Sequence, residues 1–298
     1  MDLRKGMWLC RSWGNEMMTI DIHIHPLVKE ACEMEPRLFE WQREIYGLTT
    51  SPQPLDTLVS QLEEAEVKKA ILLALDCRSR WGCCIPSNNI VAKIVAKEPD
   101  LFIGFASVDP GLGEKAIDEL KYAIKNLGLQ GVKLNPALQD FDPLSPSAER
   151  LYAEIERLEV PLLVHTGLVW SRKHRIKYCN PLVWDEIAYN HPTMKIILAH
   201  CGWPWVWDAV AVALRHENVY LDISNTFTGT PREHLRHLLT ELIPSRVTER
   251  FLGEKILFGS DYPRIEVPKM VDAAKSLSID ADVIRRILHF NALEVLFK

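Results

Sequence analysis

Thr19-Ile20-Asp21-Ile22-His23-Ile24-His25-Pro26 alternates apolar and polar residues over the length of a short strand. Residues two apart on a strand point to the same face, so His23 and His25 should project side by side. Two imidazoles directed at one point can share a metal ion, although two polar residues at a strand end can also alternate without any function. What the pair means depends on what the rest of the chain places beside it.

Apolar runs of strand length recur seven more times after this stretch, and helical patterns separate them. We expect strands at 69–75, 101–108, 131–135, 161–165, 195–200, 218–223 and 255–261, and helices at 55–67, 87–97, 114–126, 147–158, 181–190, 205–216, 231–242, 267–277 and 280–289. Eight strand-and-helix units predict an α/β fold, a (β/α)8 TIM barrel of eight parallel strands with an extra C-terminal helix. An open doubly wound sheet is the competing arrangement. It is disfavoured because no Gly-x-Gly-x-x-Gly follows the first strand.

The chain divides into a tail and one large domain. Residues 1–18 show no periodic pattern and are expected to be an N-terminal tail, with 19–298 forming a single metal-dependent TIM-barrel domain. The segment 26–53 is too long for an ordinary connection and contains several prolines, so we expect a partly helical loop that acts as a lid over the site.

Composition limits the classes of partner. The chain has 298 residues, 47% of them hydrophobic, and a net charge of -5. This charge gives no reason to expect nucleic acid or an anionic membrane, which leaves a small molecule as the expected partner. The absence of 18 consecutive apolar residues and of a signal-peptide pattern predicts a cytoplasmic protein. Seven cysteines without a Cys-x-x-Cys suggest neither a disulfide framework nor a thiolate zinc site.

Polar residues stand at the predicted strand ends. In a barrel the active site lies at the carboxyl ends of the strands. Each such residue alone has a structural explanation, as a hydrogen-bonded histidine or a helix-capping aspartate. Together they place four of the chain's ten histidines at one rim, with ligand types that suit Zn²⁺ or another divalent metal. The candidates are His23, His25, Lys133, His165, His200 and Asp261.

The strand-end residues lie in five motifs that resemble those of a known family. The motifs are Asp21-Ile22-His23-Ile24-His25-Pro26, Gly131-Val132-Lys133-Leu134-Asn135-Pro136, Leu163-Val164-His165-Thr166-Gly167, Leu198-Ala199-His200-Cys201-Gly202 and Phe258-Gly259-Ser260-Asp261-Tyr262-Pro263. They resemble the amidohydrolase superfamily, and most closely its amidohydrolase-related branch of aminocarboxymuconate-semialdehyde decarboxylase-like proteins. The resemblance runs from about residue 19 to the C-terminus.

The resemblance implies a role for each histidine and for the aspartate. His23, His25, His165 and Asp261 would bind one divalent metal, zinc in most of this branch. Asp261 would also act as general base, and His200 would activate water or move a proton. Metal-bound water loses its proton near neutral pH, and a carboxylate beside it can accept that proton.

Lys133 leaves the number of metal ions open. In binuclear members of the superfamily, a lysine at the end of the fourth strand is carbamylated and bridges two ions. An unmodified Lys133 could instead bind a substrate carboxylate. We expect one ion, with a binuclear site containing carbamylated Lys133 as the alternative.

The loops after the strands suggest a carboxylated substrate. Arginine binds carboxylates through two parallel hydrogen bonds, and tryptophan can form the wall of a pocket for a flat ring. Solvated basic loops and helix packing would explain the same residues. The substrate-binding candidates are Arg80, Trp170, Arg172, Trp203 and Arg264.

Three functions remain open from the sequence. The first, which we predict, is a metal-dependent hydrolase that opens an ester, lactone or amide of a small carboxylated substrate through metal-activated water. The second is a non-oxidative, metal-dependent decarboxylase of an aromatic or muconate-type acid. The third is a barrel that only binds or acts as a scaffold. A homodimer is the common pattern of this branch.

Overall fold

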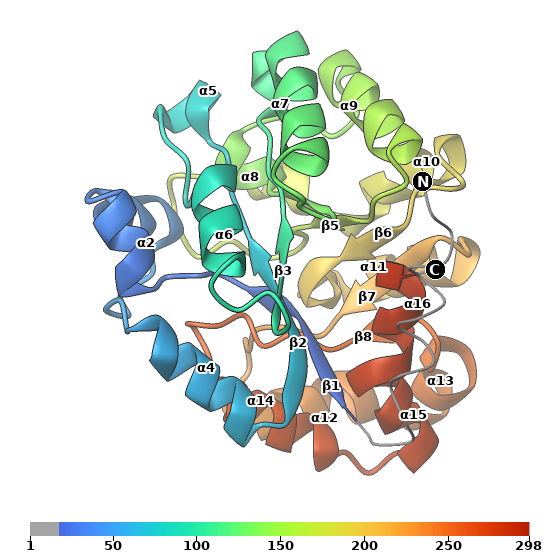
Figure 1. Cartoon of the computed structure of the whole chain (residues 1–298). Coiled ribbons are helices and arrows are strands. Elements are labelled where there is room, and N and C mark those ends of the chain that lie inside the picture. Colours follow the sequence, from blue (N-terminus) through green and yellow to red (C-terminus); the bar gives the residue numbers. More distant parts are fainter. Residues whose placement is uncertain (1–17, 298) are drawn as a thin grey trace.

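The structure of the chain, a computed structural model, describes residues 18–297. Strands form its centre and helices surround them (Figure 1). The N-terminal tail expected at residues 1–18 lies outside the described residues, apart from Met18.

The strands fall within or beside the apolar runs that predict them. They are β1 (Thr19–Ile24), β2 (Val67–Leu73), β3 (Phe102–Phe105), β4 (Val132–Leu134), β5 (Leu162–Val164), β6 (Ile196–Leu198), β7 (Val219–Asp222) and β8 (Ile256–Leu257). Neighbours pair in parallel, in the orders β1-β2-β3 and β4-β5-β6-β7-β8. Most strands are shorter than the expected runs because regular pairing stops before the polar residues at their carboxyl ends.

Backbone hydrogen bonds join the two groups of strands at both seams. Between β3 and β4, the Lys133 amide donates to the Ala106 carbonyl at 2.6 Å. Between β1 and the chain after β8, the His25 amide donates to the Tyr262 carbonyl at 2.8 Å. The strands thereby surround a common interior, as the predicted (β/α)8 barrel requires.

A β-bulge at the end of β1 determines which side chains face that interior. From Asp21 to Ile24 β1 advances three residues, while its partner β2 advances two, from Ala70 to Leu72. The extra residue shifts the alternation of side chains along the strand. Ile22 therefore belongs to the apolar cluster inside the barrel and Ile24 to the core outside it, while His23 and His25 face the interior.

Helices cover the outside of the barrel. The main ones are α4 (Leu55–Glu64), α6 (Asn88–Val95), α7 (Glu114–Lys125), α9 (Pro146–Arg157), α10 (Trp184–Asn190), α11 (Val206–Arg215), α12 (Pro231–Arg236), η6 (His237–Leu242), α14 (Val267–Lys275), α15 (Ala281–Arg285), η8 (Arg286–Phe290) and α16 (Asn291–Phe297). Side chains define several of their starts: Ser87 accepts from the Ile90 amide, and Thr230 forms a capping box with Glu233.

Shorter helical segments lie in the connections. They are α2 (Lys29–Met34), α3 (Leu38–Trp41), η1 (Gln42–Tyr46), α5 (Arg78–Trp81), η2 (Pro110–Leu112), α8 (Pro136–Gln139), η3 (Ile176–Cys179), η4 (Pro181–Val183), η5 (Ala199–Gly202), α13 (Ser245–Val247) and η7 (Thr248–Leu252). The first three make the segment 26–53 partly helical, as expected from its sequence.

The C-terminal helix α16 packs against the interior of the barrel. Its Ala292 and Val295 belong to the same apolar cluster as Ile20 and Leu163, which lie at the amino-terminal halves or middles of their strands. The extra C-terminal helix thus covers the end of the barrel opposite to the polar strand ends.

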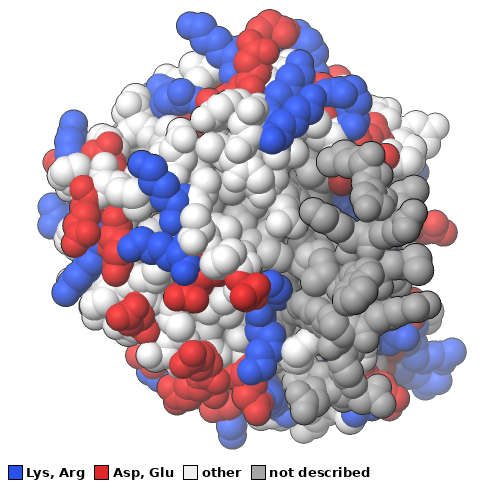
Figure 2. All heavy atoms as spheres, viewed as in Figure 1, with Lys and Arg blue, Asp and Glu red and all other residues white. Residues whose placement is uncertain are grey.

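The face of the molecule seen in Figure 2 carries basic and acidic side chains in small mixed groups. Among the residues of that face that are not drawn in grey, the basic side chains form no continuous stripe. Within residues 18–297, no helix has the length and apolar character needed to cross a membrane.

Candidate functional site

Three predicted ligands meet at the seam between β1 and β8. The Asp261 amide donates to the His23 carbonyl at 2.9 Å, which places the segment after β8 beside the end of β1. Asp261 has a positive φ of 63°, an uncommon backbone conformation for a residue other than glycine. Its Oδ1 lies 3.4 Å from Nε2 of His25 and 3.6 Å from Nε2 of His23.

These distances suit a shared metal ion. Two donor atoms that each lie about 2.1 Å from a tetrahedral ion are about 3.4 Å apart. The donor atoms of His23, His25 and Asp261 all lie within 4.8 Å of one another, and all three residues are buried. The arrangement therefore fits a divalent metal without rearrangement of the strands.

A buried carboxylate that the sequence analysis missed orients His23. Oδ2 of Asp222, at the end of β7, lies 2.6 Å from Nδ1 of His23, and the Ser224 hydroxyl lies 3.0 Å from the same nitrogen. Because a carboxylate accepts, Nδ1 carries the proton and Nε2 keeps its lone pair, on the side of Asp261 and Lys133. An acidic residue at the end of the seventh apolar run was the available sequence signal.

His200 and His165 form a second pair beside this group. Nδ1 of His200 donates to the Ser224 carbonyl at 3.1 Å, so Nε2 of His200 can accept from Nδ1 of His165 at 3.2 Å. This order leaves Nε2 of His165 as an acceptor, and that buried atom has no hydrogen-bond partner among the described residues. An unpaired buried lone pair is available to a metal or a ligand. His165 is not part of the three-residue group with His23, His25 and Asp261.

Burial keeps these imidazoles neutral. It lowers the pKa of His200 to about 3 and the pKa values of His23, His25 and His165 below their usual range. Burial alone would raise the pKa of Asp261, but the surrounding histidines, His25 first, lower it, so this carboxyl is ionised. Neutral imidazole and ionised carboxylate are the forms that bind metals.

Lys133 faces the same interior from β4. Its Nζ lies 3.3 Å from Nε2 of His23, and burial lowers its pKa to about 8. A fraction of its amine is therefore uncharged near neutral pH, which is the form that reacts with CO2. The geometry is compatible with either role expected for this residue.

Part of the segment 26–53 lies over the histidines. The ring of Tyr46, at the end of η1, packs edge-to-face on His25 with 5.1 Å between ring centroids. Nη2 of Arg264 donates to the Tyr46 carbonyl at 2.9 Å, and Nε2 of His174 donates to the Ile45 carbonyl at 2.9 Å. Two loops, one after β5 and one after β8, thus hold η1 against the site.

Two neighbouring cavities share Arg264. The inner pocket has a volume of about 30 Å³, enough for about one water molecule. It is lined by His25, Tyr46, Lys133, Asn135, Leu138, His165, Leu168, Val169, Trp170, His200, Asn225, Asp261 and Arg264. The outer cleft, with a volume of about 560 Å³, lies between α4, the start of α12 and the segment after β8.

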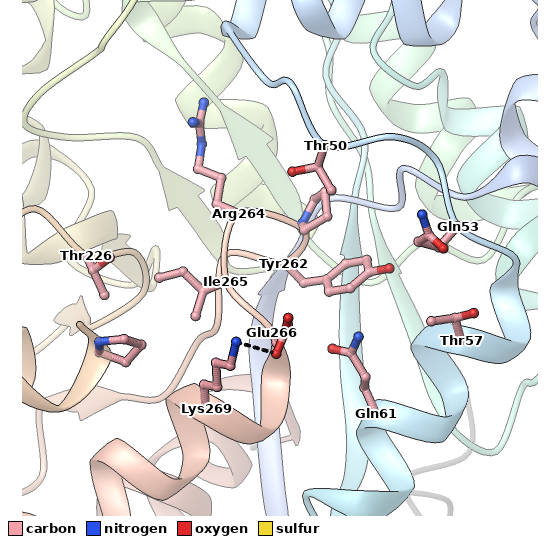
Figure 3. Close-up of a pocket in the computed structure, with 12 residues that line it drawn as sticks. Thr50, Gln53, Thr57, Gln61, Thr226, Tyr262, Arg264, Ile265, Glu266 and Lys269 are labelled. Carbon is pink, nitrogen blue, oxygen red and sulfur yellow. Dashed lines mark ion pairs between the residues drawn. The ribbon is translucent and has the colours of Figure 1, made fainter. Parts of the chain in front are cut away.

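Figure 3 shows the outer cleft, where Tyr262 lies between Gln61 and Thr50, and Lys269 is paired with Glu266 at 2.7 Å. Hydroxyl and amide groups from Thr50, Gln53, Thr57 and Gln61 line one side of it. Arg264 therefore separates a small inner pocket from a polar cleft large enough for an organic acid.

Of the other predicted substrate-binding residues, one lines the inner pocket and three do not. Trp170 lines the inner pocket and stacks on Phe227, which also stacks on Trp203 at a ring distance of 4.7 Å. Trp203, Arg80 and Arg172 are not among the residues that line this pocket. Arg80 instead lies 3.8 Å from Asp140, and Arg172 is exposed.

Comparison with known proteins identifies sequence relatives. A family model described as Amidohydrolase, Amidohydro_2, matches residues 20–298. The 2-amino-3-carboxymuconate-6-semialdehyde decarboxylase of Dictyostelium discoideum is 22% identical over 236 residues, covering 70% of this chain and 65% of the relative. The gamma-resorcylate decarboxylase of Rhodococcus jostii is 24% identical over 220 residues, covering 59% of this chain and 65% of the relative. These alignments span just under two thirds of each relative.

Solved structures share the architecture. An uncharacterized TIM-barrel protein from Bordetella bronchiseptica has a TM-score of 0.73 at 23% identity, covering 94% of this chain and 98% of that chain. A dihydroxybenzoic acid decarboxylase from Polaromonas sp. JS666, with bound manganese and the inhibitor 2-nitroresorcinol, has a TM-score of 0.64 at 20% identity, covering 94% and 96%. The predicted TIM-barrel fold is confirmed.

Proposed function

Because this chain belongs to the Amidohydro_2 family of amidohydrolases, we propose that it is a metal-dependent enzyme that decarboxylates an aromatic or muconate-type acid without oxidation. This was the second of the functions left open by the sequence. Both curated relatives described above are decarboxylases, which supports it over the hydrolase that the sequence analysis placed first. The observation that carries the proposal is the buried group of His23, His25 and Asp261. His200 lines the inner pocket together with His25 and Asp261.

We assign the metal to His23, His25, Asp261 and His165. A divalent metal bound there would hold oxygen atoms of the acid and stabilise negative charge as the carboxylate departs. Zinc is the ion predicted from the sequence, and manganese is bound in the Polaromonas protein, so both are candidates.

The remaining pocket residues would bind the acid and supply a proton. Lys133 and Arg264 present cationic groups to a substrate carboxylate. When the carbon–carbon bond breaks, CO2 leaves and the ring carbon takes a proton. We assign that proton to His200 rather than to Asp261, whose pKa the neighbouring histidines lower. Because Nε2 of the neutral His200 is an acceptor, it would first have to take up a proton when the acid binds. A carboxylate bound beside His200 would favour its protonated form.

Hydrolysis is the second candidate, and Lys133 favours it. A buried lysine on β4, 3.3 Å from a metal-ligand nitrogen, stands where carbamylation would complete a binuclear site. Two equivalents of metal per chain and a 44 Da adduct on Lys133 would support this candidate. One equivalent and an unmodified lysine would support the mononuclear assignment.

The deciding experiment follows both products. Protein loaded with zinc or manganese is incubated with a panel of hydroxybenzoates, including 2,6-dihydroxybenzoate, and with a panel of lactones. We expect CO2 release, abolished by chelation and reduced by about 100-fold or more in His200→Ala. His216→Ala is the control, because His216 pairs with Asp185 outside the inner pocket. Acid release from a lactone, without CO2 release from any acid, would overturn the proposal. If the protein converted no compound of either panel, the third function, a barrel that only binds or acts as a scaffold, would be favoured.

A further inference from the structure

Tyr46 has a buried hydroxyl that the proposed reaction does not use. Its oxygen is shielded from solvent and has no hydrogen-bond partner among residues 18–297. Buried polar atoms without a partner are uncommon and unfavourable, so each one calls for an explanation. Tyr46 lines the inner pocket together with His25, Lys133 and Asp261.

The side chain is held in place from several directions. Its ring packs edge-to-face on His25 at an interplanar angle of 62°. The backbone on either side is fixed by Arg264, which binds the Tyr46 carbonyl, and by His174, which binds the Ile45 carbonyl. Gly47 then ends the turn with a φ of 68°, a conformation that suits glycine. These contacts would hold a phenylalanine equally well, so they do not account for the hydroxyl.

The chemistry of the pocket suggests what the hydroxyl would bind. A tyrosine hydroxyl is protonated near neutral pH and can donate a hydrogen bond. Of the nearby unpaired nitrogens, Nε2 of His165 can offer a lone pair to a metal, whereas Nδ1 of His25 carries the proton when Nε2 of His25 binds the metal. Neither nitrogen is therefore an acceptor for the Tyr46 hydroxyl, and an acid bound at this site would bring an oxygen that can accept from it.

We propose that Tyr46 is a substrate-binding residue whose hydroxyl donates a hydrogen bond to an oxygen atom of the acid held at the inner pocket. The ligand class is an aromatic or unsaturated acid with a carboxylate or ring-hydroxyl oxygen directed toward η1. This inference rests on the proposed function for the kind of ligand, while its test does not require turnover.

The chain provides a matched control. Tyr152, on α9, also has a buried hydroxyl without a partner among the described residues, and its ring packs on Trp184 outside both cavities. Tyr46→Phe and Tyr152→Phe each remove one unpaired hydroxyl and retain the ring. Only the first should change ligand binding.

The test measures binding of 2-nitroresorcinol, a non-reacting probe, to the metal-loaded full chain by calorimetry. We expect Tyr46→Phe to raise its Kd about 10-fold with unchanged metal content, and Tyr152→Phe to leave Kd unchanged. The same Kd in Tyr46→Phe and the wild type would overturn the inference. CO2 release tests the proposed function separately: an affected Kd without CO2 from any acid would overturn the function alone.

Melting temperature gives a readout that does not depend on the probe. Since the hydroxyl has no partner in the ligand-free protein, Tyr46→Phe should melt at the same temperature as the wild type or above it. A fall of several degrees, absent in Tyr152→Phe, would show that the hydroxyl has a structural partner and would overturn the inference. Absence of probe binding to the wild type would also count against it.

Discussion

A single carboxylate outside the pocket lining controls the orientation of a predicted metal ligand. Asp222 is fully buried and fixes the proton of His23 on Nδ1, while its other oxygen accepts from the Ser224 amide at 2.6 Å. Carboxylates that orient a ligating histidine in this way also raise its basicity. The residue would therefore act on a bound metal through His23.

Asp222→Asn should weaken metal binding. We expect the affinity for Zn²⁺ or Mn²⁺ to fall about 10- to 100-fold, because an amide holds the imidazole less strongly and gives it no negative charge. Competition with a chromophoric chelator measures this. Asp185→Asn is the control, since Asp185 pairs with His216 at 2.7 Å away from the site. Equal affinities in wild type and Asp222→Asn would show that His23 needs no orienting carboxylate.

How far the site could be predicted differs from residue to residue. His23, His25 and Asp261 could be predicted because barrel geometry places strand ends together. The same rule would have reached Asp222, but the predicted strand ran to Ile223 and its polar end residue was not counted. Tyr46 could not be predicted, because its position depends on how η1 packs and on partners more than 100 residues away in sequence, such as His174. The bulge in β1 also leaves no mark in the alternating pattern.

At the scale of elements, η1 contributes Tyr46 to the wall of the inner pocket. The pocket volume of about 30 Å³ is smaller than an aromatic acid, so binding of the proposed acid would require another part of the wall to shift. The turn is tied to the neighbouring loops by the hydrogen bonds of His174 and Arg264 to its carbonyls. This is consistent with the lid predicted for the segment 26–53, which stays a prediction.

His174→Ala should loosen this turn. Loss of the hydrogen bond to Ile45 should raise amide exchange rates within Gln42–Tyr46 about 5-fold, since a typical bond contributes about 1 kcal/mol. Hydrogen exchange measured by mass spectrometry checks this, with peptides from α4 as the internal reference. His237→Ala, at a half-buried histidine that pairs with Glu241, should change nothing in η1. Unchanged exchange would mean that Arg264 alone holds the turn.

A buried histidine at the start of α12 should make stability depend on pH. Nδ1 of His234 accepts from the Thr228 hydroxyl at 3.0 Å, and burial lowers its pKa to about 4 from an ordinary value of 6.5. Between these values the unfolded chain binds a proton that the folded chain does not, so acidification favours unfolding. The stabilising effect is complete above pH 6.5 and is lost as the pH falls toward 4.

His234→Gln should reduce that dependence. From pH 7.5 to pH 5, the wild type should lose about 2 kcal/mol more unfolding free energy than the variant, as the two pKa values require. Urea unfolding at both pH values measures the unfolding free energy. Comparing the wild type with the variant cancels the pH dependence that comes from other titratable groups. Equal losses would mean that His234 titrates normally in the folded chain.

For the whole molecule, the fold could be predicted because each strand lies in a short stretch rich in apolar residues that is followed by a helical pattern. Boundaries were less accurate, as at β8, where pairing covers Ile256–Leu257 and the predicted run extended to Asp261. Short segments such as α8 and α13 escaped prediction because three or four residues do not show a helical period. Their ends are set by tertiary packing, for example by Asn135, which caps α8 by accepting from the Leu138 amide.

The helix at the far end of the barrel should contribute to stability. Val295 of α16 is buried in the interior cluster, so Val295→Ala should lower the unfolding free energy by about 1–3 kcal/mol. Leu214→Ala, at an exposed leucine of α11, is the control and should change it by less than about 0.5 kcal/mol. Denaturant titration compares them. A neutral Val295→Ala would show that α16 is not a structural part of the barrel.

The inner pocket is lined by residues at strand ends and by residues in connecting segments, which differ in how well they tolerate sequence changes. His25, Lys133, His165, His200 and Asp261 stand at or just beyond strand ends, where the barrel fixes them, whereas Tyr46, Trp170 and Arg264 are carried by connections. Connections tolerate insertion and replacement better than strands do. Exchange of the connections after β1, β5 and β8 with those of another barrel should therefore give a protein that retains the histidines and Asp261 of the proposed metal site and has a different pocket wall. That makes the chain a practical starting point for redirecting selectivity by loop grafting.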